Sequence, residues 1–149
     1  MTQLHHEIKI NAAPEKVWEA LANLETVQHY NPLVASTKYT SANREGVNAA
    51  RHCDFKPNGF SKEKVTEWIP NKLLGMEVVE SSFPMKYTRW KTHLKGDESG
   101  GTLVSQDLEY EVKFGPIGML LHFLMMKNKY NSILQNIFDG LKKYVVKSK

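Results

Sequence analysis

The sequence contains little cysteine, and it lacks the long apolar runs that mark secreted and membrane proteins. Cys53 is the only cysteine in 149 residues, which excludes an internal disulfide and fits a reducing compartment. The N-terminal residues contain no apolar run of the kind that a secretory signal needs. The most apolar segment, Ile117 to Met126, is far shorter than the ~20 residues of a membrane-spanning helix. We therefore expect a soluble cytoplasmic protein with no stable membrane insertion.

The excess of positive charge is also small. Twenty Lys and Arg face sixteen Asp and Glu, a formal net charge of +4, and the cations form no stripe of the kind that binds nucleic acid. We therefore expect no nucleic-acid partner. The densest basic group is the C-terminal tail, Lys142, Lys143, Lys147 and Lys149. Its cations are favourable at a helix C-terminus, and weak contact with an acidic membrane surface is the alternative interpretation.

Motifs for metal binding and for common enzyme chemistry are missing. The six histidines are scattered, with no cysteine or carboxylate at ligand spacing. The chain has no glycine-rich phosphate loop, nucleophile elbow or helical H-E-x-x-H. We expect no metal and no cofactor. Cys53 shares a face with apolar residues, which indicates a small buried side chain and not a nucleophile.

The chain does contain a regular order of strands and helices. Leu4 to Ile10 alternates apolar and polar residues, which predicts a first strand. Two short helices should follow, one beginning at Pro14 and one around Leu24 to His29, ending before Pro32. Period-two alternation then predicts six more strands: Val34 to Ala42, Val47 to Lys56, Phe60 to Ile69, Leu73 to Ser82, Tyr87 to Lys95 and Thr102 to Phe114.

The last third of the chain, Phe114 to Lys149, predicts one long helix. Its apolar residues recur at steps of three and four: Met119, Phe123, Met126, Tyr130, Leu134, Ile137, Leu141 and Val145. About thirty residues of helix span roughly 45 Å, so the apolar stripe needs a broad partner. We therefore predict an α+β helix-grip fold, formed by residues 1–149 as one domain. A curved antiparallel sheet of six or seven strands would wrap around the C-terminal helix, with two short helices after the first strand. A cavity is expected between sheet and helix, because two curved surfaces do not meet everywhere.

Several short motifs occur in order along the chain. They are Ile8-Lys9-Ile10-Asn11-Ala12-Ala13-Pro14-Glu15-Lys16-Val17-Trp18, Tyr30-Asn31-Pro32, Glu67-Trp68-Ile69-Pro70 and Phe114-Gly115-Pro116-Ile117-Gly118. This order resembles the START/Bet v 1-like (SRPBCC) superfamily, and within it the bacterial polyketide cyclase/dehydrase-like proteins. The resemblance implies the same fold and three segments around a pocket mouth: Lys56 to Phe60, Ser82 to Met85 and Phe114 to Gly118. Members include lipid and hormone binders as well as aromatase/cyclases, so the fold alone does not define the function.

Arg51 and Glu63 are the charged residues that alternation places on inner faces. Burying an arginine is costly unless it is paired, and Glu63 lies on the next strand. A three-residue turn at Pro57 to Gly59 would put Glu63 next to Cys53 and diagonal to Arg51. It would also place Glu67 on the inner face. A two-residue turn would reverse the faces. The pair is either a polar group inside the pocket that orients a ligand oxygen, or a structural ion pair near the edge of the sheet that contacts no ligand.

Other candidate ligand-binding residues share the inner face or the helix stripe: Trp90, Gln106, Tyr110, Phe123, Met126 and Tyr130. Gln106 and Tyr110 could bond a polar group of a ligand; the remaining residues would form the pocket wall or ordinary core. The predicted function is binding of a largely apolar small molecule, lipid-like or aromatic/polyketide-like. The alternative is an enzyme of the polyketide cyclase/aromatase type, with a cyclase/dehydratase-like activity that uses no metal or cofactor. No catalytic residue, oligomeric state or protein-interaction motif can be assigned from the sequence.

Overall fold

The computed structural model describes residues 2–83, 85–113 and 127–147. Its seven strands are β1 (Thr2–Ile10), β2 (Val34–Tyr39), β3 (Ala50–Phe55), β4 (Phe60–Ile69), β5 (Leu73–Ser81), β6 (Met85–Gly96) and β7 (Thr102–Val112). Its helices are α1 (Pro14–Ala22), the 3-10 helix η1 (Leu24–Thr26), α2 (Val27–Tyr30) and α4 (Lys127–Lys147). The predicted order of elements is therefore confirmed across the described ranges.

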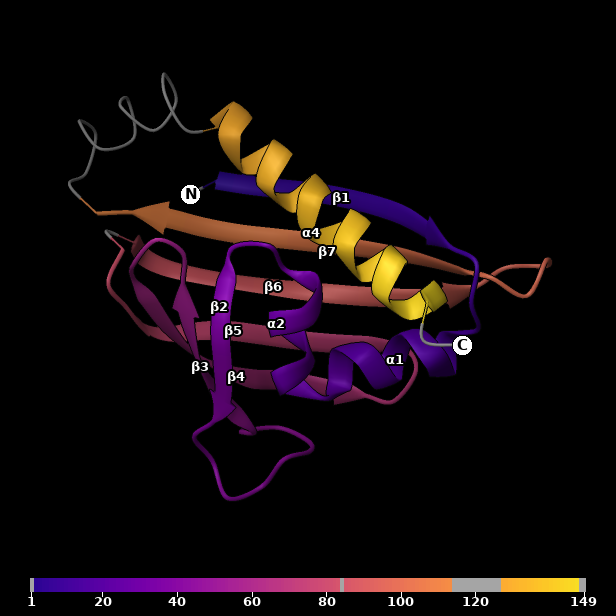
Figure 1. Cartoon of the computed structure of the whole chain (residues 1–149), viewed down its shortest axis with the longest axis horizontal. Coiled ribbons are helices and arrows are strands. Elements are labelled where there is room, and N and C mark those ends of the chain that lie inside the picture. Colours follow the sequence, from indigo (N-terminus) through magenta and orange to yellow (C-terminus); the bar gives the residue numbers. More distant parts are fainter. Residues whose placement is uncertain (1, 84, 114–126, 148–149) are drawn as a thin grey trace.

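All seven strands form one antiparallel sheet with the order β1-β7-β6-β5-β4-β3-β2. Strands β2 to β7 form a meander in which each strand pairs with the next along the chain. The first strand pairs with the last, and the two edges of the sheet are β1 and β2. The sheet curves around the helices (Figure 1). Curvature of this kind gives the sheet an inner face that can enclose other groups.

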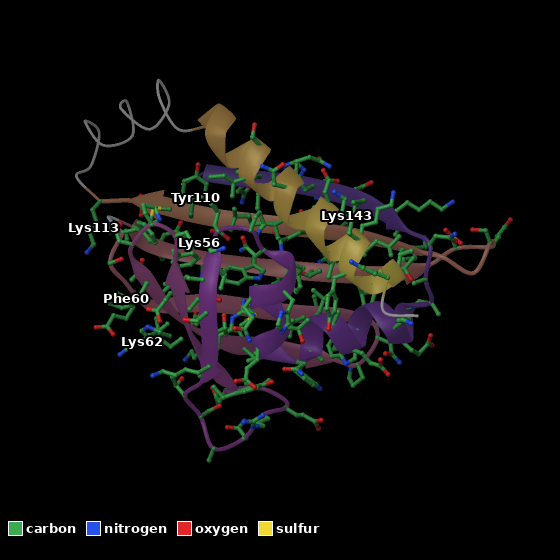
Figure 2. The ribbon with its side chains drawn as sticks, viewed as in Figure 1. Lys56, Phe60, Lys62, Tyr110, Lys113 and Lys143 are labelled. Atoms are coloured by element: carbon green, nitrogen blue, oxygen red, sulfur yellow. The ribbon has the colours of Figure 1, made fainter. Side chains whose placement is uncertain are left out.

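Helix α4 crosses the inner face of the sheet and packs against α1, α2 and β1 (Figure 1). The apolar stripe of its sequence predicts this packing. Leu134, Leu141 and Val145 of the stripe are 8, 1 and 1 % exposed, and Ile137 is partly buried. Lys143, labelled in Figure 2, is one of the exposed residues of this helix. The first part of the predicted helix lies outside the described residues. The rest confirms that the C-terminal helix lies across the sheet.

Helix α1 begins as the sequence predicts, with Pro14 in its first turn. Its apolar face buries Val17 and Leu21, together with Trp18, whose ring meets that of Trp68 edge-on at 5.1 Å between centroids. This contact places α1 against the C-terminal end of strand β4. None of the helices in the described ranges is both long and apolar enough to cross a membrane.

The predicted strand ends around the β2–β3 connection are wrong. β2 ends at Tyr39 and β3 begins at Ala50, so the loop between them is longer than alternation suggested. Gly46 and Asn48 have positive φ angles of 82° and 75°, which a strand does not accommodate. Val47, with which the predicted strand Val47 to Lys56 begins, lies in this loop and is 51 % exposed.

Candidate ligand-binding cavity

A cavity of about 270 Å³ lies between the inner face of the sheet and the helices. Its wall is largely apolar, with a few polar groups, which is the usual composition of a small-molecule site. The sheet contributes Leu74, Met76, Val78 and Trp90, among others, and α4 contributes Ile133, Leu134, Ile137, Phe138 and Leu141. The described helix and sheet therefore do not fill the space between them completely.

Arg51 and Glu63 form a buried ion pair in the wall of this cavity. They lie directly opposite each other on β3 and β4 and are 5 and 6 % exposed. Glu63 Oε1 lies 2.8 Å from Nε and 2.7 Å from Nη2 of Arg51. Burial alone lowers the pKa of the arginine, but the adjacent carboxylate outweighs burial, so the pKa of Arg51 is raised. The guanidinium therefore stays charged, and the pair as a whole has no net charge.

The predicted pairing of these residues is right about the face and wrong about the register. Phe55 N–H donates to Gly59 O at 2.9 Å, so the turn consists of residues 56–58, one residue earlier than expected. Arg51 therefore faces Glu63 directly, and Cys53 faces Ser61. Moving a turn by one residue shifts the cross-strand partners by two positions, which preserves the faces. The two-residue turn is excluded.

Glu67, which counted against this arrangement, points to the outer face. The register of β4 against β5 shifts between Val65 and Glu67, and a β-bulge of this kind reverses the side-chain alternation. Glu67 accordingly forms an ion pair of 2.8 Å with Lys91 on the outer face. Ile69, two residues further along β4, shares this face and is 48 % exposed.

The ion pair is surrounded by three polar side chains that sequence reasoning did not assign to the site. Ser61 Oγ donates to Glu63 Oε2 at 2.7 Å, and Arg51 Nη1 donates to Leu24 O at 3.1 Å. Tyr30 lies beside Arg51; burial raises the pKa of its hydroxyl and Arg51 offsets this only partly. Burial likewise raises the pKa of the Cys53 thiol, to about 11.

Some of these residues could have been found from the sequence. Ser61 lies two residues before Glu63, so alternation places both on the same face. Tyr30 was noted only as part of the motif Tyr30-Asn31-Pro32. Its position beside Arg51 depends on how α2 packs against β2 and α4, and no local pattern encodes that arrangement.

Besides Arg51 and Glu63, the structure places two of the predicted binding residues on the cavity wall and one in the core. Trp90 and Gln106 line the cavity. Tyr110 is fully buried in a cluster with Leu4, Leu108 and Leu134. Leu108 and Leu134 line the cavity, but Tyr110 is not itself among the described lining residues. Its hydroxyl is thus not among the groups that the described structure presents to a ligand.

The remaining predicted binding residues lie in the first part of the helix that the sequence predicts. Phe123 and Met126 lie outside the described residues. Tyr130 lies in α4, and its side chain is outside the description. Their roles stay predictions.

Two of the three segments expected around the mouth approach each other at one end of the sheet. Phe55 and Phe83 pack edge-on with centroids 5.5 Å apart, and both line the cavity. A β-carbon on Gly59 would lie 2.8 Å from the ring of Phe83, so glycine permits this approach. Lys56 and Phe60 lie at the same end as Lys113 (Figure 2). The third segment, Phe114 to Gly118, lies outside the described residues.

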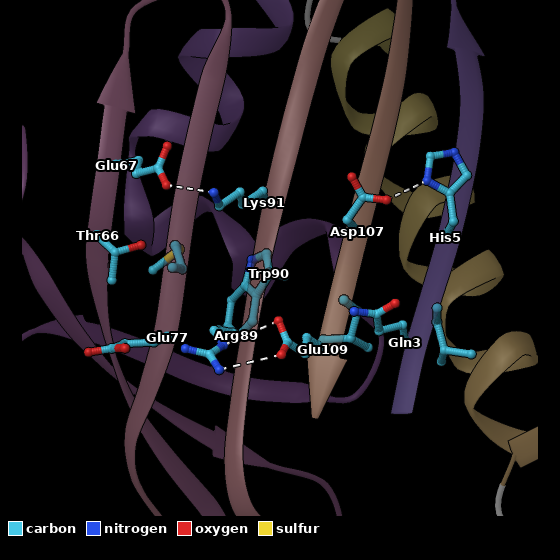
Figure 3. Close-up of a pocket in the computed structure, with 13 residues that line it drawn as sticks. Gln3, His5, Thr66, Glu67, Glu77, Arg89, Trp90, Lys91, Asp107 and Glu109 are labelled. Carbon is cyan, nitrogen blue, oxygen red and sulfur yellow. Dashed lines mark hydrogen bonds and ion pairs between the residues drawn. The ribbon is translucent and has the colours of Figure 1, made fainter. Parts of the chain in front are cut away.

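A second hollow, of about 580 Å³, lies on the outer face of the sheet (Figure 3). Its charged side chains pair with one another: Lys91 with Glu67, Arg89 with Glu109, and His5 with Asp107 at 2.6 Å. The hydrogen bond that His5 donates to the Asp107 carboxylate raises the pKa of His5. Ion pairs between exposed side chains are weak and screened by solvent, and we assign this face no role. Within residues 2–83, 85–113 and 127–147, no group of His, Cys, Asp or Glu could hold a metal ion.

These features define a helix-grip domain, with a cavity of apolar walls and a buried ion pair between its sheet and its C-terminal helix. The chain belongs to the family described as polyketide cyclase/dehydrase and lipid transport, whose model matches residues 1–146. None of the curated proteins matches the sequence.

Solved structures show the same fold at low sequence identity. A protein from Thermus thermophilus is similar with a TM-score of 0.83 and 20 % identity, covering 99 % of each chain. A START superfamily protein from Mycobacterium smegmatis gives 0.81 and 14 %, also covering 99 % of each chain. Ara h 8.0201 gives 0.76 and 15 %, covering 98 % of each. These likenesses confirm the START/Bet v 1-like fold.

Proposed function

We propose that the protein binds a small, uncharged and largely apolar molecule in the cavity under α4, with one oxygen of the ligand at the Arg51–Glu63 pair. The observation that carries the proposal is this fully buried, mutually neutralised pair in an apolar wall. A buried ion pair is weak as a stabilising device, which favours a role in recognition.

The hydrogen bonds around the pair indicate which kind of ligand group fits. The carboxylate of Glu63 is occupied by Arg51 and Ser61. Arginine has five N–H donors. Two of them point to Glu63, one to Leu24 O and one to the Tyr30 hydroxyl, which leaves one for a ligand. Since the pair has no net charge, a carbonyl, ether or hydroxyl oxygen fits better than a carboxylate.

The size of the cavity supports a compact ligand. Its volume of about 270 Å³ lies at the lower limit of the roughly 300–1,000 Å³ of typical small-molecule sites. Two or three rings, or a short acyl chain, would fill the described space. The family, which includes lipid transport, agrees with a ligand of this kind.

Catalysis of the cyclase/aromatase type is the second candidate, and the geometry favours it less. Glu63 is the one carboxylate among the described lining residues, and both of its oxygens accept hydrogen bonds. The raised pKa of Tyr30 keeps this hydroxyl protonated. A general base needs a free proton-accepting atom at working pH, so the described groups suit binding better.

The first test asks whether the cavity is the binding site. N-phenyl-naphthylamine, a neutral probe whose fluorescence rises in apolar surroundings, should bind the protein at neutral pH. Ile137→Trp fills the cavity from α4 and should abolish binding, whereas Val146→Trp on the exposed face of the same helix should not. Equal binding by both variants would contradict the proposal.

The second test identifies the ligand and the role of the pair. Native mass spectrometry of protein purified from its own host should reveal a retained, uncharged small molecule. Its affinity should fall about tenfold or more in the double variant Arg51→Met/Glu63→Leu, since hydrogen bonds to a charged group are lost. A retained carboxylate, or an unchanged affinity, would overturn the assignment of the ligand oxygen to this pair.

A further inference from the structure

A second polar group faces the same cavity, on the other side of its apolar floor. Thr92 of β6 and Gln106 of β7 are cross-strand partners, and Gln106 Nε2 donates to Thr92 Oγ1 at 3.1 Å. Both residues line the cavity, and Thr92 is 3 % exposed. A side-chain amide has two N–H donors and a carbonyl acceptor, so the bond to Thr92 uses only part of its capacity.

The adjacent strand adds to the hydrogen-bonding capacity at this position. His6 of β1 is the cross-strand partner of Gln106, and its ring packs edge-on against Phe138 of α4 at 6.0 Å. Within the described part of the chain, its Nε2 is buried without a hydrogen-bond partner. Burying a polar atom without a partner costs free energy. His6 is not itself among the described lining residues, so Gln106 and Thr92 are the groups that a ligand in the cavity would meet.

The distance between the two polar positions follows from their pairing partners on strand β5. Val78 pairs with Glu63, and Leu74 pairs with Thr92. Leu74 and Val78 are four positions apart on β5. Both line the cavity, and so does Met76, which lies between them. At the usual rise and strand spacing, the Cα atoms of Glu63 and Thr92 are roughly 13 Å apart along the strands and roughly 10 Å apart across them. The inner surface thus has two polar positions separated by an apolar floor.

We propose that Thr92 and Gln106 form a second polar subsite, so that the cavity selects elongated, uncharged molecules that have an oxygen at each end. The apolar floor would contact the body of such a molecule, one oxygen would meet Arg51, and the other would meet the Gln106 amide. A flexible chain with a single polar end would satisfy only one of the two positions. This inference rests on the proposed function, because it concerns the same cavity.

The experiment compares three rigid probes that share one skeleton: biphenyl, para-phenylphenol and para,para′-biphenol. All three are uncharged at neutral pH and have zero, one and two hydroxyls. Calorimetry or displacement of N-phenyl-naphthylamine should rank their affinities in the order of hydroxyl number. The second hydroxyl should add about three- to tenfold in affinity, the contribution of one hydrogen bond.

Gln106→Met removes the amide and keeps the length of the side chain. In this variant para,para′-biphenol should bind no better than para-phenylphenol, while the affinity for biphenyl stays unchanged. Thr92→Val keeps the shape of the side chain and removes the hydroxyl that bonds the Gln106 amide. This variant should reduce the difference in affinity between para,para′-biphenol and para-phenylphenol. Asn136→Ala, on the exposed side of α4, is the control. Circular dichroism and the unchanged binding of biphenyl verify that each variant is folded.

The outcomes separate the two proposals. Failure of all three probes to bind would remove the proposed function. Binding of para-phenylphenol without further gain from the second hydroxyl would leave the proposed function intact and overturn the second subsite. If the second hydroxyl still raised the affinity in Gln106→Met, the second subsite would be overturned as well, because another group would then bind the second oxygen.

Discussion

Gly140 of helix α4 lies directly against the backbone carbonyl of Tyr30 at the end of α2. A β-carbon at position 140 would collide with Tyr30 O. The absence of a side chain at Gly140 therefore determines how closely α4 approaches α2, and with it the position of the helix over the cavity. Tyr30 is itself part of the cavity wall, so this backbone contact connects helix packing with the shape of the site.

Gly140→Ala should destabilise the protein. Helix propensity alone predicts a gain of up to ~1 kcal/mol for alanine over glycine, whereas forcing a methyl group into a packed contact costs about 1–3 kcal/mol. We expect the contact to dominate, with a lower midpoint in urea unfolding followed by circular dichroism. Asn136→Ala, four residues earlier on the exposed side of the helix, should be neutral or slightly stabilising. A stabilised Gly140→Ala would show that α4 can move away from α2 without cost.

Arg51→Leu should destabilise the fold more than the double variant Arg51→Met/Glu63→Leu. The single change leaves the Glu63 carboxylate buried and unpaired, which costs about 3–5 kcal/mol. The double change removes both charges, and apolar residues of similar volume restore most of the loss. Urea unfolding of the three proteins measures this difference. Equal losses for the single and the double variant would mean that the pair contributes through packing and not through charge.

Asp97 should make the stability of the β6–β7 hairpin dependent on pH. Hydrogen bonds from Ser99 and Gly101 lower the pKa of its carboxyl to about 2. In the unfolded chain the pKa is ordinary, about 4. The ionised carboxylate therefore stabilises the folded state above about pH 4, and this contribution is lost as the pH falls toward about 2.

Asp97→Asn should consequently lower Tm at neutral pH, and its difference from the native protein should shrink as the pH falls through this window. Glu98→Gln, at an exposed position in the same loop, serves as the control and should show little difference at any pH. A difference for Asp97→Asn that is constant from neutral pH to pH about 2 would contradict the role of its charge.

Cys53 should be unreactive in the folded protein. It is 1 % exposed, and burial raises the pKa of its thiol to about 11, so little thiolate is present at neutral pH. An aromatic disulfide reagent should label native protein at least about a hundredfold more slowly than protein unfolded in urea, because labelling requires opening of the structure. The variant Cys53→Ala/Ser99→Cys, with its thiol in an exposed loop, should react rapidly in the native state. Fast labelling of Cys53 itself would indicate that the cavity admits the reagent.

Alternation predicted which residues face inward wherever a strand is regular. In β7 it separated Val104 and Leu108, which are buried, from Asp107, which forms ion pairs on the outer face. It failed after Val65, because the β-bulge in β4 turns Glu67 outward. Bulges insert a residue without any strong signal in composition. Gly75, opposite the bulge, fits because a β-carbon there would lie 2.9 Å from Thr66 Oγ1.

The candidate site could likewise be predicted from side-chain alternation only in part. Arg51 and Glu63 could be paired from alternation and from the cost of burying charge, and the structure confirms that they form an ion pair. Their exact register depended on where the β3–β4 turn closes, which proline, asparagine and glycine at residues 57–59 leave open.

The sequence by itself determined the order of the elements, the antiparallel sheet, the buried stripe of α4 and the pairing of Arg51 with Glu63. Each of these follows from side-chain periodicity or from a local energetic cost, which are properties of neighbouring residues in the chain. Only the tertiary structure decided that Tyr30 lies beside Arg51, that Gly140 lies against the backbone of Tyr30, and that Thr92 and Gln106 face the same cavity. These contacts join segments far apart in the sequence, so they depend on how the curved sheet and the helices pack, and no local pattern specifies that geometry.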